Sequence, residues 1–357
     1  MAMSDKRQLN QASWTNDASA NESAAQSSKM TMLQRVAPFG DTSLSFEMTM
    51  PDGWVEDRDL APIDAPDEYL VTIARFRQSA KSELPVIEVN FTIIGEEVGL
   101  ADWFDLYVQM GELRLLRPKR AAAAETVAPL LRYRARQPVG ERECIGEYGL
   151  IRDGNRIFLV IGTAAEDDFR KIAGVFDRSI QSFRLLNPAS SKYAEPVSSV
   201  NGRDGQRLFS YPSRWELVTL DGLSPGKRGA DLRFVEEGDV LGYIRAKQLQ
   251  RSAYPDITPE GAFREARLEV EDSGFQPSRD GWQLVPAPFS TSFGVSELKF
   301  ARGTFAGVKD EVWIQVVTGD EALHVFTLLT PSRSENVRQW MINRRAFEIV
   351  IGSLIPG

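Results

Sequence analysis

The sequence predicts an α+β protein made of two tandem domains, each an antiparallel sheet flanked by helices. Three observations carry this prediction. The chain has 357 residues, more than one hydrophobic core usually supports, so two domains are expected. Runs with strand-like alternation outnumber helical ones in both halves. The halves also run through the same order of elements, each opening with a strand, a turn and a tryptophan.

The first half contains strand-like runs on either side of one helical run and closes with a second helix. The run 86–94 shows the alternation plainly, because every second residue from Ile87 to Ile93 is apolar. An Asp-Gly pair at 153–154 predicts a tight hairpin turn between the last two runs. The predicted strands cover 43–50, 69–77, 86–94, 129–136, 143–151 and 156–164, and the predicted helices cover 100–116 and 166–183.

The second half repeats this order of strands and helices. Its first helix is predicted to begin with Thr258 as the N-cap and Pro259 at the first helical position, the places these residues favour. The predicted strands cover 207–211, 231–237, 240–249, 281–286, 295–305, 310–317 and 323–329, and the predicted helices cover 258–274 and 337–354.

A proline followed three residues later by a tryptophan marks the same corner in both halves, at Trp54 and Trp215. The offset between the halves is 161 at these tryptophans (215 minus 54) and 171 at the closing helices (351 minus 180). Loop insertions account for such a drift. We therefore interpret the chain as a divergent duplication and predict that Trp54 and Trp215 are structural anchors of their cores.

Three large aromatic residues lie on predicted helices: Trp103 and Phe104 in the first half and Trp340 in the second. Such residues usually pack a helix onto a sheet. If they face outward, they form an apolar groove suited to a partner's helix. They are therefore the candidate partner surface.

Composition divides the chain into four parts. Residues 1–37 are predicted to be a disordered N-terminal tail, because the segment offers little apolar surface to offset its ordering entropy. Residues 38–187 form the first predicted domain and 203–357 the second. The polar, aperiodic stretch 188–202 between them is predicted to be the linker.

Charge and cysteine content exclude several classes of protein. The 50 acidic residues outnumber the 42 basic ones, for a net charge of -8, which argues against a nucleic-acid-binding surface. Cys144 is the single cysteine, so neither an intrachain disulfide nor a thiolate-rich metal site is expected. It lies in a predicted strand, where a lone cysteine usually acts as a small buried hydrophobic residue.

No constellation of catalytic residues is recognisable. His324 is the single histidine and lies in a predicted strand, which favours a partly buried structural residue over a general base. Phosphate-binding glycine loops and nucleophile elbows do not occur. We therefore expect no enzyme activity, no catalytic, metal-binding or cofactor-binding residues, and no cofactor.

No run of apolar residues is long enough for a membrane-spanning helix, and the first residues lack the apolar core of an export signal. The chain as given is therefore expected in the cytoplasm. The alternative is the bacterial periplasm or envelope, if a leader has been removed.

The strand-turn-tryptophan opening, the helix halfway and the closing helices ending "IQSFRLL" and "VIGSLIP" resemble the PsbP/DcrB-like α/β/α sandwich group. That group includes the photosystem oxygen-evolving accessory protein, the Ran-binding Mog protein, mycobacterial LpqN-type lipoproteins, and DcrB-like proteins, among them the Eag chaperones of type VI secretion effectors. The resemblance implies two tandem α/β/α sandwiches. It brings no catalytic signature with it.

The expected function is that of a non-enzymatic, protein-binding accessory or chaperone-like protein. By resemblance, its setting would be a bacterial secretion or envelope complex. The partner is expected to be a protein with an apolar or helical segment and not a nucleic acid. The alternative is a carrier of a small apolar molecule or lipid, held inside one sandwich.

Overall fold

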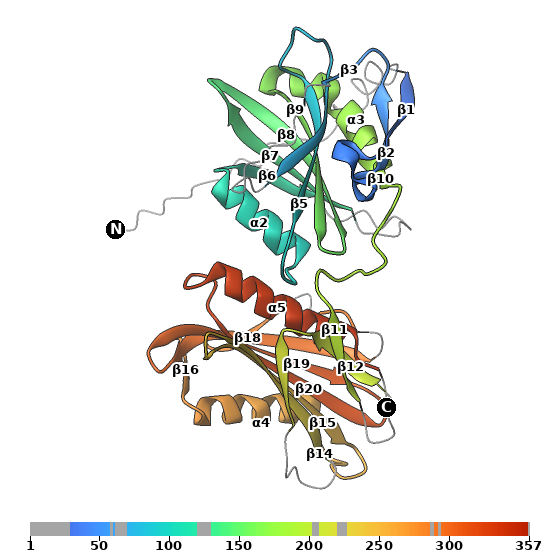
Figure 1. Cartoon of the computed structure of the whole chain (residues 1–357). Helices are drawn as coiled ribbons and strands as arrows, with labels where there is room; N and C mark the ends of the chain where they lie inside the picture. The colour runs from blue at the N-terminus through green and yellow to red at the C-terminus, as the bar shows by residue number, and fades with distance from the viewer. Residues whose placement is uncertain are drawn as a thin grey trace, which may run out of the picture. The chain divides into compact units, whose positions relative to one another are not determined.

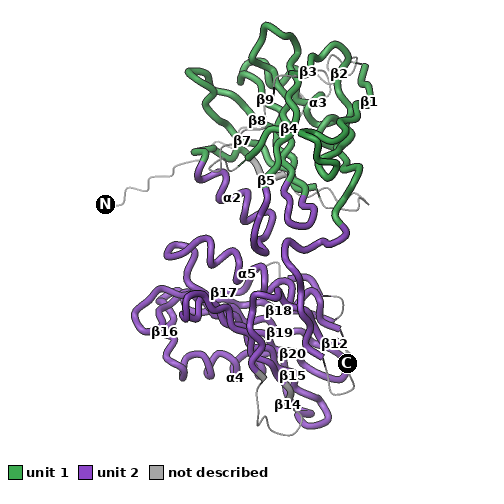
Figure 2. The backbone as a smooth tube through the Cα atoms, in the orientation of Figure 1, with its two compact units in different colours: residues 1–92, 111–151, 158–189 green, residues 93–110, 152–157, 190–357 purple. Residues whose placement is uncertain are grey.

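The computed structural model describes residues 29–57, 60, 70–119, 130–201, 207–219, 227–285, 289–291 and 294–355 of the chain. The chain divides into two compact units (Figure 2). The first unit comprises Met1–Thr92, Gly111–Ile151 and Phe158–Ala189. The second comprises Ile93–Met110, Arg152–Ile157 and Ser190–Gly357. The second unit therefore includes two segments from the first half of the sequence.

Strands of the first half form an antiparallel sheet in the order β3-β4-β5-β9-β8-β7-β6 (Figure 1). Its members are β3 (Val55–Glu56), β4 (Val71–Arg77), β5 (Val86–Ile93), β6 (Arg114–Lys119), β7 (Leu131–Val139), β8 (Arg142–Asp153) and β9 (Arg156–Ala165). A separate small sheet has the order β1-β2-β10, with β1 (Met30–Arg35), β2 (Phe46–Pro51) and β10 (Arg184–Leu185). The helices are η1 (Pro38–Gly40), η2 (Thr42–Leu44), α2 (Leu100–Met110) and α3 (Glu166–Ser182).

The second half forms an antiparallel sheet in the order β13-β14-β15-β20-β19-β18-β16, with β17 also paired to β18. Its members are β13 (Trp215–Thr219), β14 (Lys227–Glu236), β15 (Asp239–Gln250), β16 (Phe275–Pro277), β17 (Gln283–Leu284), β18 (Val295–Phe305), β19 (Val308–Thr318) and β20 (Ala322–Pro331). The hairpin β11 (Val197–Asn201) and β12 (Arg207–Pro212) precedes them, and the helices are α4 (Pro259–Asp272) and α5 (Val337–Gly352).

The two large sheets have the same connectivity. Read along each sheet, β3, β4, β5, β9, β8, β7 and β6 take the places of β13, β14, β15, β20, β19, β18 and β16. The expected α+β fold with two antiparallel sheets flanked by helices is thereby confirmed. Shared connectivity is what a duplication would produce, and the duplication itself stays an interpretation.

Helices α4 and α5 lie on opposite faces of the second sheet (Figure 1). Successive residues of β19 point to alternate faces, and their contacts follow that rule. Val312 and Ile314 pack in one core with Phe263 of α4. Trp313 instead contacts Trp340 of α5, with the ring centroids 6.3 Å apart. Helix α4 begins as predicted, with Pro259 in its first turn and the Thr258 hydroxyl accepting a hydrogen bond from the Gly261 N–H at 3.0 Å.

The core of the first unit centres on phenylalanines from the small sheet, the large sheet and the end of α3. The ring of Phe183 lies 5.2 Å from that of Phe46 and 6.1 Å from that of Phe158, centroid to centroid. All three side chains are fully buried. The closing helix of the first half is therefore fixed by its last turn, as its apolar stripe predicts.

Several segments differ from the sequence-based prediction. The helix predicted for 100–116 ends at Met110, and its last residues lie in strand β6, which begins at Arg114. Strand β1, at Met30–Arg35, lies inside the predicted tail 1–37, and it pairs with β2 over its whole length. Residues 1–28 of that tail lie outside the described residues. Strand β11, at Val197–Asn201, lies inside the predicted linker 188–202 and pairs with β12. Strands β1 and β11 are short and partly exposed, so neither has the long apolar alternation that predicts a strand.

Candidate functional site

The two predicted anchor tryptophans are not equally buried. Trp215, the first residue of β13, is 3% exposed, and its ring lies 5.8 Å from that of Phe234. Trp54, immediately before β3, is half-buried and packs against the core of the first unit. Both occupy the same corner of their sheets, where a strand of the small hairpin leads into the edge strand of the large sheet.

The candidate partner surface needs a correction, because Trp103, Phe104 and Trp340 are all buried. The rings of Trp103 and Phe104 stack on Tyr107, 5.7 and 5.8 Å away, one helical turn further along α2. Trp340 lies against Trp313 of the sheet. These residues therefore pack inside the protein and offer no exposed apolar groove.

Trp340 instead supports two arginines that contact α2. The Arg344 guanidinium lies over the Trp340 ring at 5.5 Å from its centroid, and Arg333 lies over the same ring at 5.2 Å. Arg344 pairs with Asp102, and Arg333 pairs with Asp105 at 3.2 Å. A guanidinium held over an aromatic face is pre-positioned for a carboxylate. The spacing of three residues puts both carboxylates on one face of α2.

Burial affects the charge of Asp102. Its side chain is almost inaccessible, and burial raises the pKa of its carboxyl, while Arg344 acts in the opposite direction. Burial is the larger effect. The ion pair of Asp102 and Arg344 is therefore a partly desolvated contact, of the kind that costs much to break from one side.

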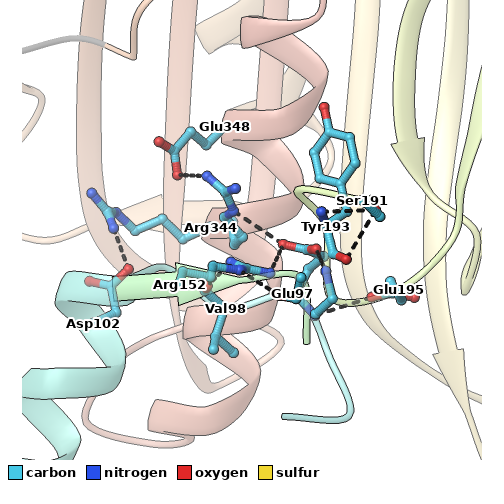
Figure 3. A network of polar contacts seen from close by, with 12 residues as sticks. Glu97, Val98, Asp102, Arg152, Ser191, Tyr193, Glu195, Arg344 and Glu348 are labelled. Atoms are coloured by element: carbon cyan, nitrogen blue, oxygen red, sulfur yellow. Dashed lines mark hydrogen bonds and ion pairs between the residues drawn. The ribbon is translucent and has the colours of Figure 1, made fainter. Parts of the chain in front are cut away.

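A second buried network surrounds Glu97 in the loop before α2 (Figure 3). Glu97 is fully buried. Its Oε2 accepts hydrogen bonds from Arg152 at 2.6 Å and from Arg345 of α5 at 3.3 Å. Its Oε1 accepts one from the backbone N–H of Ala194. The carboxylate is thus saturated by two guanidinium groups and an amide, an arrangement suited to holding segments together and not to acid–base chemistry.

The loop that carries Glu97 also contacts Glu195. The Glu97 N–H donates to Glu195 Oε1 at 3.2 Å, and burial raises the pKa of the Glu195 carboxyl. Arg152 donates to the carbonyl of Val98 at 2.7 Å, and Arg345 also pairs with Glu348 at 2.9 Å. All of these residues belong to the second compact unit. They join its two early segments, 93–110 and 152–157, to α5 and to the segment before β11.

An open groove of about 950 Å³ lies at one end of the second sheet, on the side of α5. It is bordered by the end of α2, by β16, by the β18–β19 hairpin and by the residues that lead into α5. Its lining comprises Gln109, Gln276, Pro277, Ser278, Arg302, Gly303, Thr304, Lys309, Asp310, Glu311, Ser332, Arg333, Ser334 and Val337. The lining is rich in hydroxyl, amide and charged side chains.

Glu311 forms the floor of this groove. Its side chain is almost fully buried, and its carboxylate accepts hydrogen bonds from three donors. Arg302 lies 3.2 Å away, and the indole N–H groups of Trp313 and Trp340 lie at 3.2 and 2.8 Å. A carboxylate with three donors has little capacity left for a ligand. Glu311 therefore organises the groove and does not present a free negative charge to it.

The groove's cations are more accessible than its floor. The side chains of Arg302 and Lys309 are 68% and 66% exposed. Lys309 pairs with Glu335 at 2.9 Å, and Arg333 pairs with Asp105. Neither Glu335 nor Asp105 belongs to the lining. Such exposed ion pairs contribute little free energy and exchange readily.

Asp310, although part of the lining, directs its side chain elsewhere. It alternates with Glu311 along β19 and shares the face of Val312, which packs with α4. Its carboxylate accepts a backbone hydrogen bond from Phe305, and burial raises its pKa to about 6. Among the residues that the structure describes, no cation pairs with it.

His324 and Cys144 both lie buried in strands. His324 is 7% exposed in β20, and burial lowers its pKa to about 4, so the imidazole is neutral at pH 7. Cys144 is fully buried in β8, and burial raises the pKa of its thiol. The described residues contain no group of three or more His, Cys, Asp or Glu that could hold a metal ion. Within the same residues, no helix is long and apolar enough to cross a membrane.

Comparison with known proteins finds similarity in solved structures only. No protein-family model and no curated protein sequence matches the chain. The solution structure of PsbP from the cyanobacterium Synechocystis sp. PCC 6803 is 15% identical, with a TM-score of 0.33, over 45% of this chain and 96% of the PsbP chain. It is a protein of the group that the sequence resembles.

Two further structures match over most of their length. The immunity protein TplEi of the type VI secretion system of Pseudomonas aeruginosa is 11% identical, with a TM-score of 0.23, over 90% of this chain and 98% of its own. A chain of the Tle4–Tli4 complex is 10% identical, with a TM-score of 0.22, over 86% of this chain and 96% of its own. At such identities and scores, no function is transferred to this chain.

Proposed function

We propose that this chain is a non-enzymatic, protein-binding accessory protein and that its groove receives a segment of the partner. The observation that carries the proposal is the groove itself, which is open, lined by many charged and hydroxyl-bearing residues, and shaped by β16, the β18–β19 hairpin and the start of α5. Its volume is at the upper end of the range of ligand sites, about 300 to 1,000 Å³. Strand ends and loops on a rigid sheet are where binding residues commonly lie.

The groove's side chains support binding better than catalysis. Glu311, its most buried carboxylate, is bound by three donors within the protein. The single histidine and the single cysteine are both buried in strands. Neither is part of the groove lining. A general base within reach of a nucleophile, the usual core of hydrolytic or transfer chemistry, is therefore not supported at this site.

The lining also separates this proposal from the alternative of an apolar carrier. Ligand sites for apolar molecules are lined mainly by hydrophobic and aromatic side chains. Here the aromatic side chains near the groove, Trp313 and Trp340, are turned to the floor, where they donate to Glu311. The charged lining residues favour a peptide segment over a lipid, but most of the surface that the lining exposes is apolar, so a segment with apolar side chains, as expected from the sequence, also fits.

A setting in a bacterial secretion or envelope complex belongs to the same proposal, as does a chaperone-like role. These points come from the resemblance of the sequence. They predict that the partner is another component of such a complex.

Site-specific photocrosslinking in the source cell tests the proposal. A photoreactive residue replaces Ser278 in the groove, or Asp167 on the exposed side of α3 as the control. We expect one protein adduct from the Ser278 position and none from the control. The same adducts from both positions, or none from either, would contradict a binding groove. A lipid retained by the intact protein in native mass spectrometry would favour the carrier instead.

A further inference from the structure

The balance of charge inside the groove differs from that of the whole chain. The chain carries a net charge of -8. In the groove lining, three cations (Arg302, Lys309 and Arg333) accompany Glu311 and Asp310. Arg302 pairs with Glu311 at the floor, and Asp310 shares the opposite face of the sheet with Val312. Lys309 and Arg333, whose carboxylate partners lie outside the lining, are therefore the positive charges that the lining contributes beyond its own ion pair.

The three cations come from separate segments that surround the groove. Arg302 lies on β18, Lys309 lies near the start of β19, and Arg333 follows β20. Arg302 pairs with Glu311 at the floor, whereas Lys309 and Arg333 pair with carboxylates outside the lining. Because the pairs of Lys309 and Arg333 are partly exposed, an incoming carboxylate can replace the carboxylate in either pair at low cost.

Hydroxyl groups lie between these cations. Ser278, Thr304, Ser332 and Ser334 belong to the lining and can donate to anionic oxygens. Val337, the first residue of α5, also belongs to the lining, and α5 has no acidic residue in its first turn. The positive end of that helix adds to the positive potential.

We propose that the groove binds an acidic segment of the partner protein, whose Asp or Glu carboxylates pair with Arg302, Lys309 and Arg333. This inference rests on the proposed function and adds the chemistry of the segment. Charges distributed around the groove fit a chain with repeated carboxylates better than they fit one compact anion. The chain as a whole is negatively charged and repels acidic segments. Attraction confined to the groove therefore makes the recognition of such a segment selective.

The test uses the full chain and fluorescent octapeptides of alternating Glu and Ser, Gln and Ser, or Lys and Ser. We expect only the Glu peptide to bind, with an affinity that falls as salt is added. The groove variant carries Arg302→Gln and Lys309→Gln. The control variant carries Arg170→Gln and Lys171→Gln on the exposed side of α3, an equal change in charge.

We expect the groove variant to bind the Glu peptide at least about tenfold more weakly, a loss of roughly 1.4 kcal/mol. The control variant is expected to bind like the wild type. Equal losses in both variants, or equal binding of the Gln peptide, would overturn the inference. Circular dichroism and thermal unfolding of each variant check that the fold is intact, because Arg302→Gln removes the cation paired with buried Glu311, whereas Lys309 and its partner are both exposed.

Two further outcomes separate the possible errors. If inorganic phosphate binds at the groove and the Glu peptide does not, the site serves a free anion and the acidic-segment inference fails. If the Ser278 crosslink forms in cells but no Glu peptide binds, the proposed function stands and the inference about the segment fails.

Discussion

At the scale of single residues, Asp310 is a half-buried carboxylate for which the described residues provide no paired cation. It is half-buried beside Phe305, and burial raises its pKa to about 6 from 3.8. Because the unfolded carboxyl ionises at a lower pH, this group favours folding below about pH 4. That stability is lost as the pH rises from about 4 to 6. At neutral pH the ionised Asp310 therefore destabilises the native state.

Asp310→Asn should raise the free energy of unfolding at pH 7 by about 1 to 3 kcal/mol, because the amide removes a poorly solvated charge. Urea unfolding at pH 7 and below pH 4 measures the effect, and we expect the gain to disappear at the lower pH. Asp239→Asn, on the exposed β14–β15 turn, is the control and should change stability by less than about 0.5 kcal/mol. If the gain in unfolding free energy had the same size at both pH values, it would come from packing and not from the charge of Asp310.

His324 gives the opposite dependence on pH. Its pKa is lowered to about 4 in the folded state, from 6.5. Its contribution to stability is complete above about pH 6.5 and is lost as the pH falls toward 4, since only the unfolded state takes up the proton. His324→Gln should flatten the stability profile between those pH values by up to about 3 kcal/mol. Parallel profiles for wild type and variant would show that the imidazole is not shielded.

Residue-scale predictions from the sequence succeeded where one side chain decides the outcome. The Thr258 cap and the burial of Cys144 and His324 in strands are of this kind, because local chemistry favours them. The candidate surface of Trp103, Phe104 and Trp340 was wrong for a different reason. Helical periodicity tells which residues share a face, but the structure of the rest of the chain decides what covers that face.

At the scale of elements, the attachment of residues 93–110 and 152–157 to α5 should depend strongly on the carboxylate of Glu97. Glu97→Gln would leave Arg152 and Arg345 without their shared carboxylate, and we expect a loss of about 3 to 5 kcal/mol in unfolding free energy. Glu96→Gln is the matched control. Its partners Arg214 and Arg338 are exposed, so we expect a loss below about 1 kcal/mol. Similar losses from the two variants would mean that the Glu97 network is solvated.

The two corner tryptophans provide a second comparison of equivalent elements. Trp215→Ala should cost about 3 to 5 kcal/mol because the ring is almost wholly buried. Trp54→Ala should cost less, about 1 to 3 kcal/mol, because Trp54 is only half-buried at the same corner. Thermal unfolding followed by near-ultraviolet circular dichroism measures both. A larger loss of unfolding free energy for Trp54→Ala than for Trp215→Ala would contradict the order expected from their burial.

Sequence patterns predicted the long strands well, since β8, β9 and β19 alternate or are continuously apolar between clear turns. They missed β1 and β11, which are short and partly exposed, and they extended the helix of α2 into β6. They also missed the ionic networks. The signal available was the pair Arg344–Arg345, which interrupts an otherwise buried stretch of α5. Charges in such a stretch require buried partners, but the sequence does not identify Glu97 or Asp102 among 50 acidic residues.

At the scale of the whole molecule, the compact units and the sequence halves have different boundaries. The second unit contains segments from both sides of Ala189. A protease site inserted between Ala189 and Ser190, both exposed, would allow the folded chain to be cut there. We expect the two pieces to elute together in size-exclusion chromatography, because Glu97 and Asp102 stay paired with Arg345 and Arg344.

The same cut in a Glu97→Gln and Asp102→Asn background is the control for that result. The pieces should then separate, or separate at lower salt than in the wild type, since the ionic contacts across the cut have been removed. If the two pieces still eluted together after these substitutions and at high salt, other contacts would hold them together.

The wide sequence separation of these contacts also has a consequence for synthesis of the chain. Glu97 and Arg345 are 248 residues apart, and a ribosome adding about 5 to 20 residues per second needs roughly 12 to 50 s to cover that distance. During this interval the nascent first half presents Glu97 and Asp102 to water, and their burial is completed only after α5 has been made. Helix α5 thus closes a structure that was begun by residues near position 97.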